Sequence, residues 1–286
     1  QNLARSRHNG VEKAFSAEEH IFDSADGLNI HCAARTHCGK IAGVYNDGLP
    51  GSEVVFNRMA GSVWGAAEEF FSAPRIDNLM CLYGTLCGFL SAKAQPDSLN
   101  LWFSADNEET GSATKQGAGS AMLSDTLDRI CETFGWDKRI LLANGFMVSA
   151  DNGHAKHPNH PELSDPKNAP RLGGGVVIKT NAAQHYTTDG PSAALFSEVC
   201  RSAGVPIQQF ANRSDQPGGS TLGSISNTKV PLLTVDIGMA QLAMHSAYET
   251  AACADCDHLT QAMTAFYGVG IASDRDGKWT LSGIAQ

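Results

Sequence analysis

Short apolar runs alternate with longer helical patterns from about Gly51 to Tyr267, and this alternation limits the fold more than any other feature of the chain. Strands that alternate with helices along a sequence favour a layered α/β fold, in which helices cover both faces of a sheet. In such folds the functional groups gather at the carboxyl ends of the strands. We therefore expect an α/β protein whose site residues lie in the loops that follow its strands.

The patterns also predict where these elements lie. We expect helices over residues 78–92, 116–135, 192–204 and about 247–267. Two of them close on glycines, Gly135 and Gly204, which suit the left-handed turn that ends many helices. We expect strands over residues 99–105, 145–150, 175–180, 207–213 and 231–238. The first fifty residues show weak periodicity, and we predict no stable element there.

The composition limits the classes of protein to which the chain can belong. The chain has 286 residues, 42% of them hydrophobic and 18% charged, which suits one large globular domain or one domain with a smaller piece. Its formal charge of −9 argues against a nucleic-acid partner, because phosphate contacts need clustered Lys and Arg. No apolar run approaches the roughly 20 residues that cross a bilayer. The N-terminal sequence QNLARSRHNGVEKAF lacks the apolar region of a signal peptide, so we expect no membrane partner.

Eight cysteines are spread over the chain, which is too low a density for a disulfide scaffold. We expect free thiols and a cytoplasmic location. The segment CADCDH, from Cys253 to His258, is similar to half of a zinc knuckle, and a partner pair is present in HCAARTHC, from His31 to Cys38. The alternative is that Cys253 and Cys256 lie one turn apart on the last helix, and we favour this alternative.

Four carboxylates and one histidine stand just after expected strands or at strand–helix junctions. They are Asp77, Glu108, Glu109, Asp151 and His245. Carboxylate oxygen and imidazole nitrogen are zinc ligands, and a catalytic zinc site keeps one position open for water. Glu108 and Glu109 are adjacent, so one of them could bind metal while the other acts as general base. The residues alone leave a second interpretation open, in which these are solvated loop acids.

Six segments, taken together and in this order, resemble the aspartyl aminopeptidase family of zinc exopeptidases. They are EEFFSAPRIDNL, DNEETGSATKQGAGS, SADNGHAKHPNH, GGVVIKTNAAQHYTT, NRSDQPGGSTLG and VDIGMAQLAMHSAYET. The resemblance runs from about residue 52 to residue 267. It implies the three-layer zinc-exopeptidase fold, a mixed β-sheet flanked by helices, and a cis peptide bond between Asp77 and Asn78.

The resemblance implies a site for two divalent metal ions, with zinc favoured and manganese or cobalt as alternatives. By position, Asp77 resembles the carboxylate that bridges both metals. Glu108 resembles the general base, and Glu109 resembles a ligand of one metal, completed by His245. Asp151 resembles a ligand of the other metal. The reaction implied is removal of N-terminal residues from peptides by metal-activated water.

The family prefers an acidic residue at the N-terminus of its peptide substrate. Lys179 matches a position expected to recognise that carboxylate, and His154 lies near the same pocket, with His157 a weaker candidate. Gly218 and Gly219, in DQPGGSTLG, match a substrate-pocket loop, where glycines let a backbone approach closely. The family also forms large homo-oligomers, so we expect a homo-oligomer here.

One part of the family pattern is missing from this sequence. The second metal needs a histidine from a His-x-Asp-Ser-Pro motif upstream of the bridging aspartate, and the nearest string here, His20 to Ser24, does not match it. We therefore expect the fold without its N-terminal portion, with a weaker second metal site and an exposed sheet edge. Residues 1–51 would be a remnant of the family's inserted oligomerisation domain or unrelated sequence, and residues 52–286 the catalytic domain.

Two classes of function follow. The first is a metal-dependent aminopeptidase that removes acidic N-terminal residues, or a related metallopeptidase with another side-chain preference. The second is a catalytically silent homologue or fragment, with an incomplete two-metal site, that serves in assembly. The metal content of the protein separates the two classes.

Overall fold

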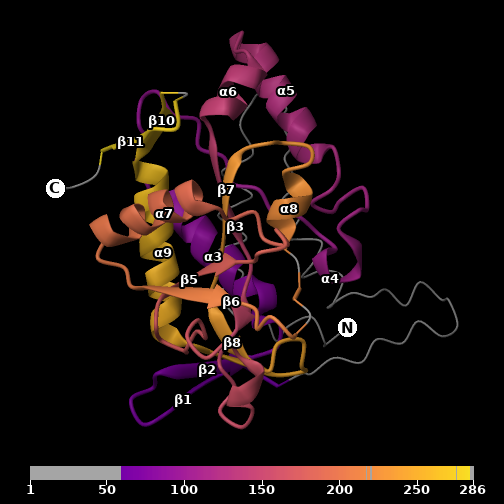
Figure 1. Cartoon of the computed structure of the whole chain (residues 1–286), viewed down its shortest axis with the longest axis vertical. Coiled ribbons are helices and arrows are strands. Elements are labelled where there is room, and N and C mark those ends of the chain that lie inside the picture. Colours follow the sequence, from indigo (N-terminus) through magenta and orange to yellow (C-terminus); the bar gives the residue numbers. More distant parts are fainter. Residues whose placement is uncertain (1–58, 217, 220, 275, 284–286) are drawn as a thin grey trace, which may run out of the picture.

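The computed structural model describes residues 59–283, apart from residues 217, 220 and 275. A four-stranded sheet lies at its centre, with the strand order β3-β7-β5-β6 (Figure 1). Strands β3 and β7 are parallel, as are β5 and β6, whereas β5 and β7 are antiparallel. The bounds are Phe146–Ala150 for β3, Val176–Thr180 for β5, Ile207–Ala211 for β6 and Leu233–Gly238 for β7. The predicted mixed sheet is thus confirmed.

A second sheet has five short strands in the order β1-β2-β9-β8-β4. They are β1 (Ser62–Trp64), β2 (Phe70–Ala73), β4 (Gly153–His154), β8 (Ala240–Leu242) and β9 (Glu249–Ala252). A hairpin of β10 (Gly270–Ser273) and β11 (Trp279–Ser282) stands apart from both sheets. Strands this short show too few alternations for the two-residue period to be seen, which is why the sequence did not predict them.

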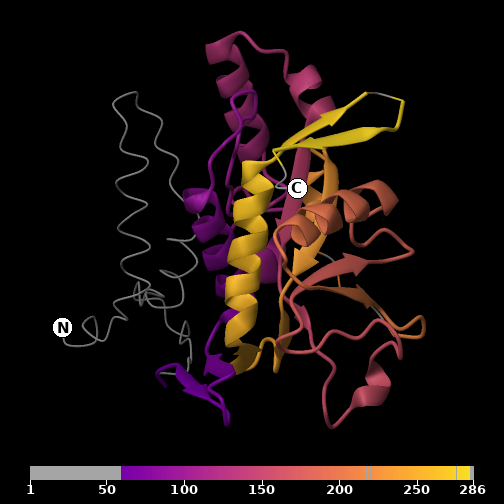
Figure 2. The same cartoon turned by 90° about the vertical axis from the view of Figure 1, so that its left-hand side faces the viewer.

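Four longer helices flank the sheets, namely α3 (Ile76–Ser91), α5 (Met122–Phe134), α7 (Gly190–Ser202) and α9 (Cys253–Gly268). Helices α3 and α9 run side by side (Figure 2). Two glycines of α3 make this close approach possible. A Cβ atom on Gly84 would stand 2.7 Å from Leu259, and one on Gly88 would stand 2.5 Å from Met263. Helix α5 ends at Gly135 in a left-handed conformation, as predicted.

The main apolar core lies between the central sheet and helices α3, α7 and α9. Strand β5 is buried on both of its faces, with Val176 and Ile178 in the main core beside Phe196 of α7. Val177 points to the opposite face and packs in a second cluster. Because side chains alternate along a strand, Lys179 shares the face of Val177. The strand therefore delivers a charged side chain to the side of the sheet away from the main core.

Three predicted boundaries were wrong. Residues 99–105 form no strand, because no described strand pairs with them. The predicted helix 116–135 begins only at Met122, after a run of turns. The last helix begins at Cys253, because Glu249–Ala252 pairs with β2 as strand β9. In the first and third cases strand pairing, or its absence, decided the local structure.

The described cysteines are free thiols. Cys253 and Cys256 lie on the first turns of α9, as the favoured interpretation predicted, while the segment from His31 to Cys38 is outside the described residues. Of the described helices, none is both long and apolar enough to cross a membrane.

Candidate functional site

Asp77 lies in the first turn of α3, directly after strand β2. The peptide bond between Asp77 and Asn78 is cis, as the resemblance implied. The Asn78 side chain donates a hydrogen bond to the carbonyl of Ala150 at the end of β3, 2.9 Å away. The Asp77 side chain is only 5% exposed, so its carboxylate is held inside the protein.

Glu108 and Glu109 begin the four-residue helix α4 (Glu108–Gly111). The preceding residue, Asn107, has a φ of 62°, and this left-handed residue turns the chain into α4. The two glutamates were predicted to follow a strand, but they follow the irregular segment 99–105. Glu108 is half-buried, and the Glu109 side chain is 44% exposed.

His245 brings two of these carboxylates together. It lies between β8 and β9 with a φ of 64°. Its Nε2 atom is 3.0 Å from Asp77 Oδ2 and 2.9 Å from Glu109 Oε1. One ligand atom from each of the three residues lies within 4.8 Å of the others. We call Asp77, Glu109 and His245 the three-residue cluster.

Glu249 holds two backbone segments of this cluster in place, and this role was not predicted from the sequence. One carboxylate oxygen accepts a hydrogen bond from the backbone N–H of Asp77 at 2.9 Å, and the other accepts from the N–H of His245 at 2.7 Å. Glu249 is buried at the start of β9. A single carboxylate thus fixes two backbone segments that are 168 residues apart. The one signal in the sequence was an acid at the head of the apolar run ETAACA.

Asp151 lies on the other side of Asp77 and has a different partner. Its Oδ2 atom is 3.3 Å from the ammonium of Lys179, which also donates to the Asn152 carbonyl at 2.7 Å. The Lys179 side chain is 3% exposed and that of Asp151 is 15% exposed. The Lys179 ammonium also lies 5.6 Å from the centre of the Tyr186 ring. The structure therefore pairs the predicted substrate residue with the predicted metal ligand.

Asn152 connects the Asp77 side of the site to the Asp151 side. Its backbone N–H donates to Asn78 Oδ1, and its amide nitrogen donates to the Ile76 carbonyl and to Gln241 Oε1 at 2.7 Å. The Cys81 thiol donates to Asn152 Oδ1. Because Asn152 is buried and uses all of its amide donors and acceptors, it fixes the loop after β3 against the start of α3.

The acids of the site crowd one another, which shifts their proton affinity. Burial, followed by the charges of Asp151 and Glu109, raises the pKa of Asp77 to about 9. The same causes raise the pKa of Glu108 to about 7. Although burial acts to lower the pKa of Lys179, the charge of Asp151 raises it above its usual value. The protein alone therefore leaves negative charge at this site incompletely balanced.

A divalent cation fits this donor set. Asp77 Oδ1 is buried and has no hydrogen-bond partner in the described chain. An orphaned carboxylate oxygen beside other carboxylates is costly unless a cation or a donor meets it. Two carboxylates and one imidazole are also ligands that zinc takes in proteins. The three-residue cluster thus matches the requirements of one zinc ion, and Asp77 Oδ1 remains for a second partner.

The other predicted residues surround the site more loosely. His154, on β4, is exposed, and desolvation followed by the charges of His245 and Lys179 lowers its pKa. His157 is exposed, and its Nδ1 accepts a hydrogen bond from the N–H of Asn159. Gly218 and Gly219 are exposed after β6, and only Gly218 has a close neighbour, Asn212. Their roles toward a substrate stay predictions.

Comparisons with known proteins agree with the fold and the family resemblance. A family model described as "Aminopeptidase I zinc metalloprotease (M18)" matches residues 13–267. A "Probable M18 family aminopeptidase 2" from Clostridium acetobutylicum is 46% identical over 202 residues, which is 70% of this chain and 46% of the relative. An "Aspartyl aminopeptidase" from Dictyostelium discoideum is 37% identical, over 71% of this chain and 45% of the relative.

A solved structure, "Structure of S. cerevesiae mApe1 dodecamer", superposes with a TM-score of 0.65 at 27% identity. It covers 74% of this chain and 49% of the solved chain. The present chain spans about half the length of the curated relatives it matches. The family match covers well over half of the chain, so this protein belongs to the M18 family of zinc aminopeptidases.

Proposed function

We propose that the chain carries the metal-binding and catalytic groups of a metal-dependent aminopeptidase. The observation that supports this most is the convergence of Asp77, Glu109 and His245, whose ligand atoms lie within 4.8 Å of one another. These residues come from three distant parts of the chain. Family membership supports the same activity, since the relatives are named as aminopeptidases.

The proposed roles follow from where each residue lies. Asp77, Glu109 and His245 would hold one zinc ion, and Asp77 with Asp151 would hold a second. Zinc, when bound, supplies Lewis acidity that makes water more nucleophilic and stabilises negative charge on the peptide carbonyl. Lys179 positions Asp151, and its ammonium is directed to that carboxylate rather than outward.

Glu108 is the proposed general base. It accepts a proton at a carboxylate oxygen as the water oxygen bonds to the carbonyl carbon of the first residue. It then returns that proton to the amide nitrogen as the carbon–nitrogen bond breaks, so that a free amino acid and a shortened peptide leave. Its half-buried position beside Glu109 supports this role, because the base must stand next to the metal ligands without being one of them.

We also propose a preference for acidic N-terminal residues. Relatives from Ricinus communis and Dictyostelium discoideum, 39% and 37% identical, are named as aspartyl aminopeptidases. Lys179 is buried against Asp151, so it would act on the substrate through that partner. His154 is exposed and within electrostatic reach of His245, and it is the better candidate for direct contact with an acidic side chain.

A homo-oligomer is the proposed state of the protein, supported by the dodecamer named for one solved relative. The cytoplasmic location stays a prediction.

The experiment is hydrolysis of Asp- and Glu-anilides, beside Leu- and Lys-anilides, by the purified chain with zinc, manganese or cobalt. We expect Asp and Glu to be preferred and Glu108→Gln to lose about 10²- to 10⁴-fold in kcat with its metal content unchanged. Thr110→Val, at the next exposed position of α4, is the control and should keep its activity. A folded chain that binds two metals but does not hydrolyse any anilide would refute the proposal, and a chain with one metal or none would support the silent form.

A further inference from the structure

Asp236, on β7, is a fully buried carboxylate that has no part in the mechanism proposed above. Ile178 of β5 pairs with Ile237, so Lys179 stands at the position beside Asp236 on the neighbouring strand. The Lys179 ammonium nevertheless donates its hydrogen bonds to Asp151 and to a backbone carbonyl. A buried charge is costly unless it is paired or hydrogen-bonded, so the donors around Asp236 decide whether its burial can be tolerated.

Three hydrogen bonds of 2.6 Å reach the Asp236 carboxylate from two loops. The backbone N–H and the hydroxyl of Thr187 donate to Oδ2, and the hydroxyl of Thr221 donates to Oδ1. Hydroxyl-to-carboxylate bonds of this length are among the stronger hydrogen bonds in proteins. The Asp236 backbone N–H adds a bond to the Thr188 hydroxyl at 2.8 Å. One residue therefore joins the loop that follows β5 to the loop that follows β6.

The start of helix α8 (Leu222–Ser226) is built around this contact. Thr221 is the N-cap residue of α8, yet its side chain makes no cap hydrogen bond and donates to Asp236 instead. A Cβ atom on Gly223 would stand 2.5 Å from Asp236 Oδ1, so glycine lets the first turn of α8 lie against the carboxylate. An N-cap threonine usually stabilises its own helix. Here its hydroxyl fixes where the helix begins relative to β7.

Both loops carry residues of the proposed substrate region. The loop after β5 carries Tyr186, whose ring centre lies 5.6 Å from the Lys179 ammonium. The loop after β6 carries Gly218 and Gly219, which the sequence assigned to the substrate pocket. Strands β5 and β6 are parallel, so both loops leave the same edge of the sheet, which is where α/β proteins bind ligands.

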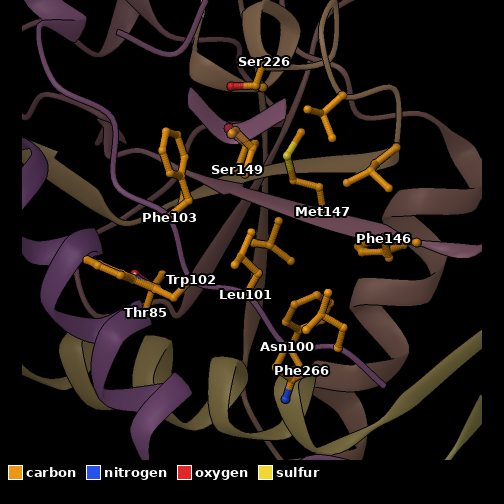
Figure 3. Close-up of a pocket in the computed structure, with 18 of the residues that line it drawn as sticks. Thr85, Asn100, Leu101, Trp102, Phe103, Phe146, Met147, Ser149, Ser226 and Phe266 are labelled. Atoms are coloured by element: carbon orange, nitrogen blue, oxygen red, sulfur yellow. The ribbon is translucent and has the colours of Figure 1, made fainter. Parts of the chain in front are cut away.

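Helix α8 also borders the space beside the metal-site carboxylates. It forms part of the wall of a cavity of about 750 Å³ that reaches Asp77 and Asp151. In Figure 3, Ser226, the last residue of α8, and Ser149 of β3 lie at the same end of this cavity. Ser149 is the β3 residue that pairs with Asp236. The place of α8, which the Asp236 carboxylate fixes, therefore shapes a wall of this cavity.

We propose that Asp236 is a positioning residue for the peptide substrate. Through Thr187 and Thr221 it holds the loops after β5 and β6 at a fixed spacing, and this spacing sets how well the first residue of the peptide fits. The inference rests on the proposed aminopeptidase function. Asp236 is buried and acts through the loops, so it does not contact the substrate. A carboxylate suits this role because it only accepts hydrogen bonds, and both loops supply donors.

The link is broken most cleanly on the threonine side. Thr221→Val keeps the shape of the side chain and removes only its hydroxyl donor. In the hydrolysis of Asp-anilide by the full chain with zinc, this variant should raise KM about tenfold and change kcat by less than about twofold, because a hydrogen bond to a charged acceptor is lost away from the reacting atoms. Thr221→Ser keeps the hydroxyl and should restore KM. Thr228→Val removes an exposed hydroxyl bonded to the Ile225 carbonyl and is the control, with unchanged KM and kcat.

Hydrogen exchange of the metal-free chain tests the same link without catalysis. Thr221→Val should speed exchange of the Thr187 amide, on the other loop, by about tenfold, whereas Thr228→Val should not. If Thr221→Val does not fold, Thr187→Val repeats the test from the other loop, because the backbone N–H of residue 187 still meets Asp236. The exchange of the Thr221 amide is then the quantity measured.

Two results would overturn the inference. One is exchange on the second loop that is the same in the variant and in the wild type. The other is a fall in kcat with KM unchanged, since Asp236 would then act on the chemical step. A wild type that hydrolyses no anilide refutes the proposed function, and the dissociation constant of an Asp-initiated peptide then replaces KM. Equal constants for Thr221→Val and the wild type, or no binding by the wild type, again overturn the inference.

Discussion

The acidic residues on the two sides of Asp77 have different partners in the structure. On one side, Glu109 and His245 are 44% and 59% exposed, and His245 Nε2 lies close to oxygen atoms of both Glu109 and Asp77. On the other side, Asp151 is mostly buried and is paired with the Lys179 ammonium. A metal ion that approaches Asp151 must compete with this internal cation. We therefore expect the metal at the three-residue cluster to bind first and more tightly.

The largest effect should come from breaking the buried pair. Lys179→Met leaves Asp151 without its cation, and loss of one partner from a buried ion pair costs about 3–5 kcal/mol of unfolding free energy. Urea unfolding of the metal-free protein measures this loss. Arg201→Met removes an exposed ion pair with Glu198 and is the control, with an expected loss much smaller than that of Lys179→Met, because solvent screens an exposed pair. Equal losses in the two variants would show that the buried Lys179 pair contributes no more to the free energy of unfolding than the exposed pair does.

Zinc should stabilise the folded chain through the three-residue cluster. At a free zinc concentration of about 100 times the dissociation constant, binding to the folded state alone adds about 2.7 kcal/mol. The measurement is the thermal midpoint with zinc and after a chelator. Asp77→Asn weakens both sides of the site, so zinc should hardly stabilise this variant. An unchanged response in Asp77→Asn would place the zinc elsewhere.

A smaller effect should follow from removing the support behind the cluster. Glu249→Gln replaces an acceptor with an amide donor that faces a backbone N–H, so Asp77 or His245 loses its fixed position. Changes of this kind beyond the metal ligands typically weaken metal binding by about 10- to 100-fold. Competition with a zinc-sensitive dye measures the affinity, and Glu198→Gln, which changes a side chain that is 40% exposed on α7, is the control. Wild-type affinity in Glu249→Gln would mean that the ligands do not depend on this carboxylate.

The smallest effect is expected on the other side. Asp151→Asn should change the affinity for the first zinc ion by less than about threefold, because Asp151 does not belong to the three-residue cluster and acts only through its charge. The same dye competition detects the difference from Glu109→Gln, which removes a ligand. If Asp151→Asn weakens the first zinc ion as much as Glu109→Gln does, the proposed order of binding is wrong.

Much of the fold could be predicted from the sequence, because long elements repeat their pattern many times. The helices α3 and α7 and the central strands β3, β5, β6 and β7 were expected within a few residues of their observed bounds, whereas the start of α9 was expected about six residues too early. Residues 99–105 were not predicted correctly, since their alternating pattern describes a strand, and a strand also needs a partner. The short strands of the second sheet carry too little pattern to be detected.

The candidate site was predictable only in part. The resemblance assigned Asp77, Glu109 and His245 to one metal site, and the structure brings one ligand atom of each residue within 4.8 Å of the others. The role of Glu249 was not predicted, because it depends on hydrogen bonds to two backbone N–H groups. No pattern of side chains in the sequence reveals such bonds. The burial of Lys179 was not predicted either, since a lysine at a strand end is exposed more often than buried.

The Glu249 carboxylate has a further consequence for how the protein handles its metal. It holds the backbones of Asp77 and His245 through hydrogen bonds that do not involve an ion, and Glu249 itself is fixed by its pairing with Ala73 of β2. The spacing of the Asp77 and His245 backbones is therefore set by the sheet. We therefore expect a divalent ion to leave and return without refolding of the chain, so that a chelated sample regains zinc on simple dialysis against zinc and different divalent ions exchange at the same site.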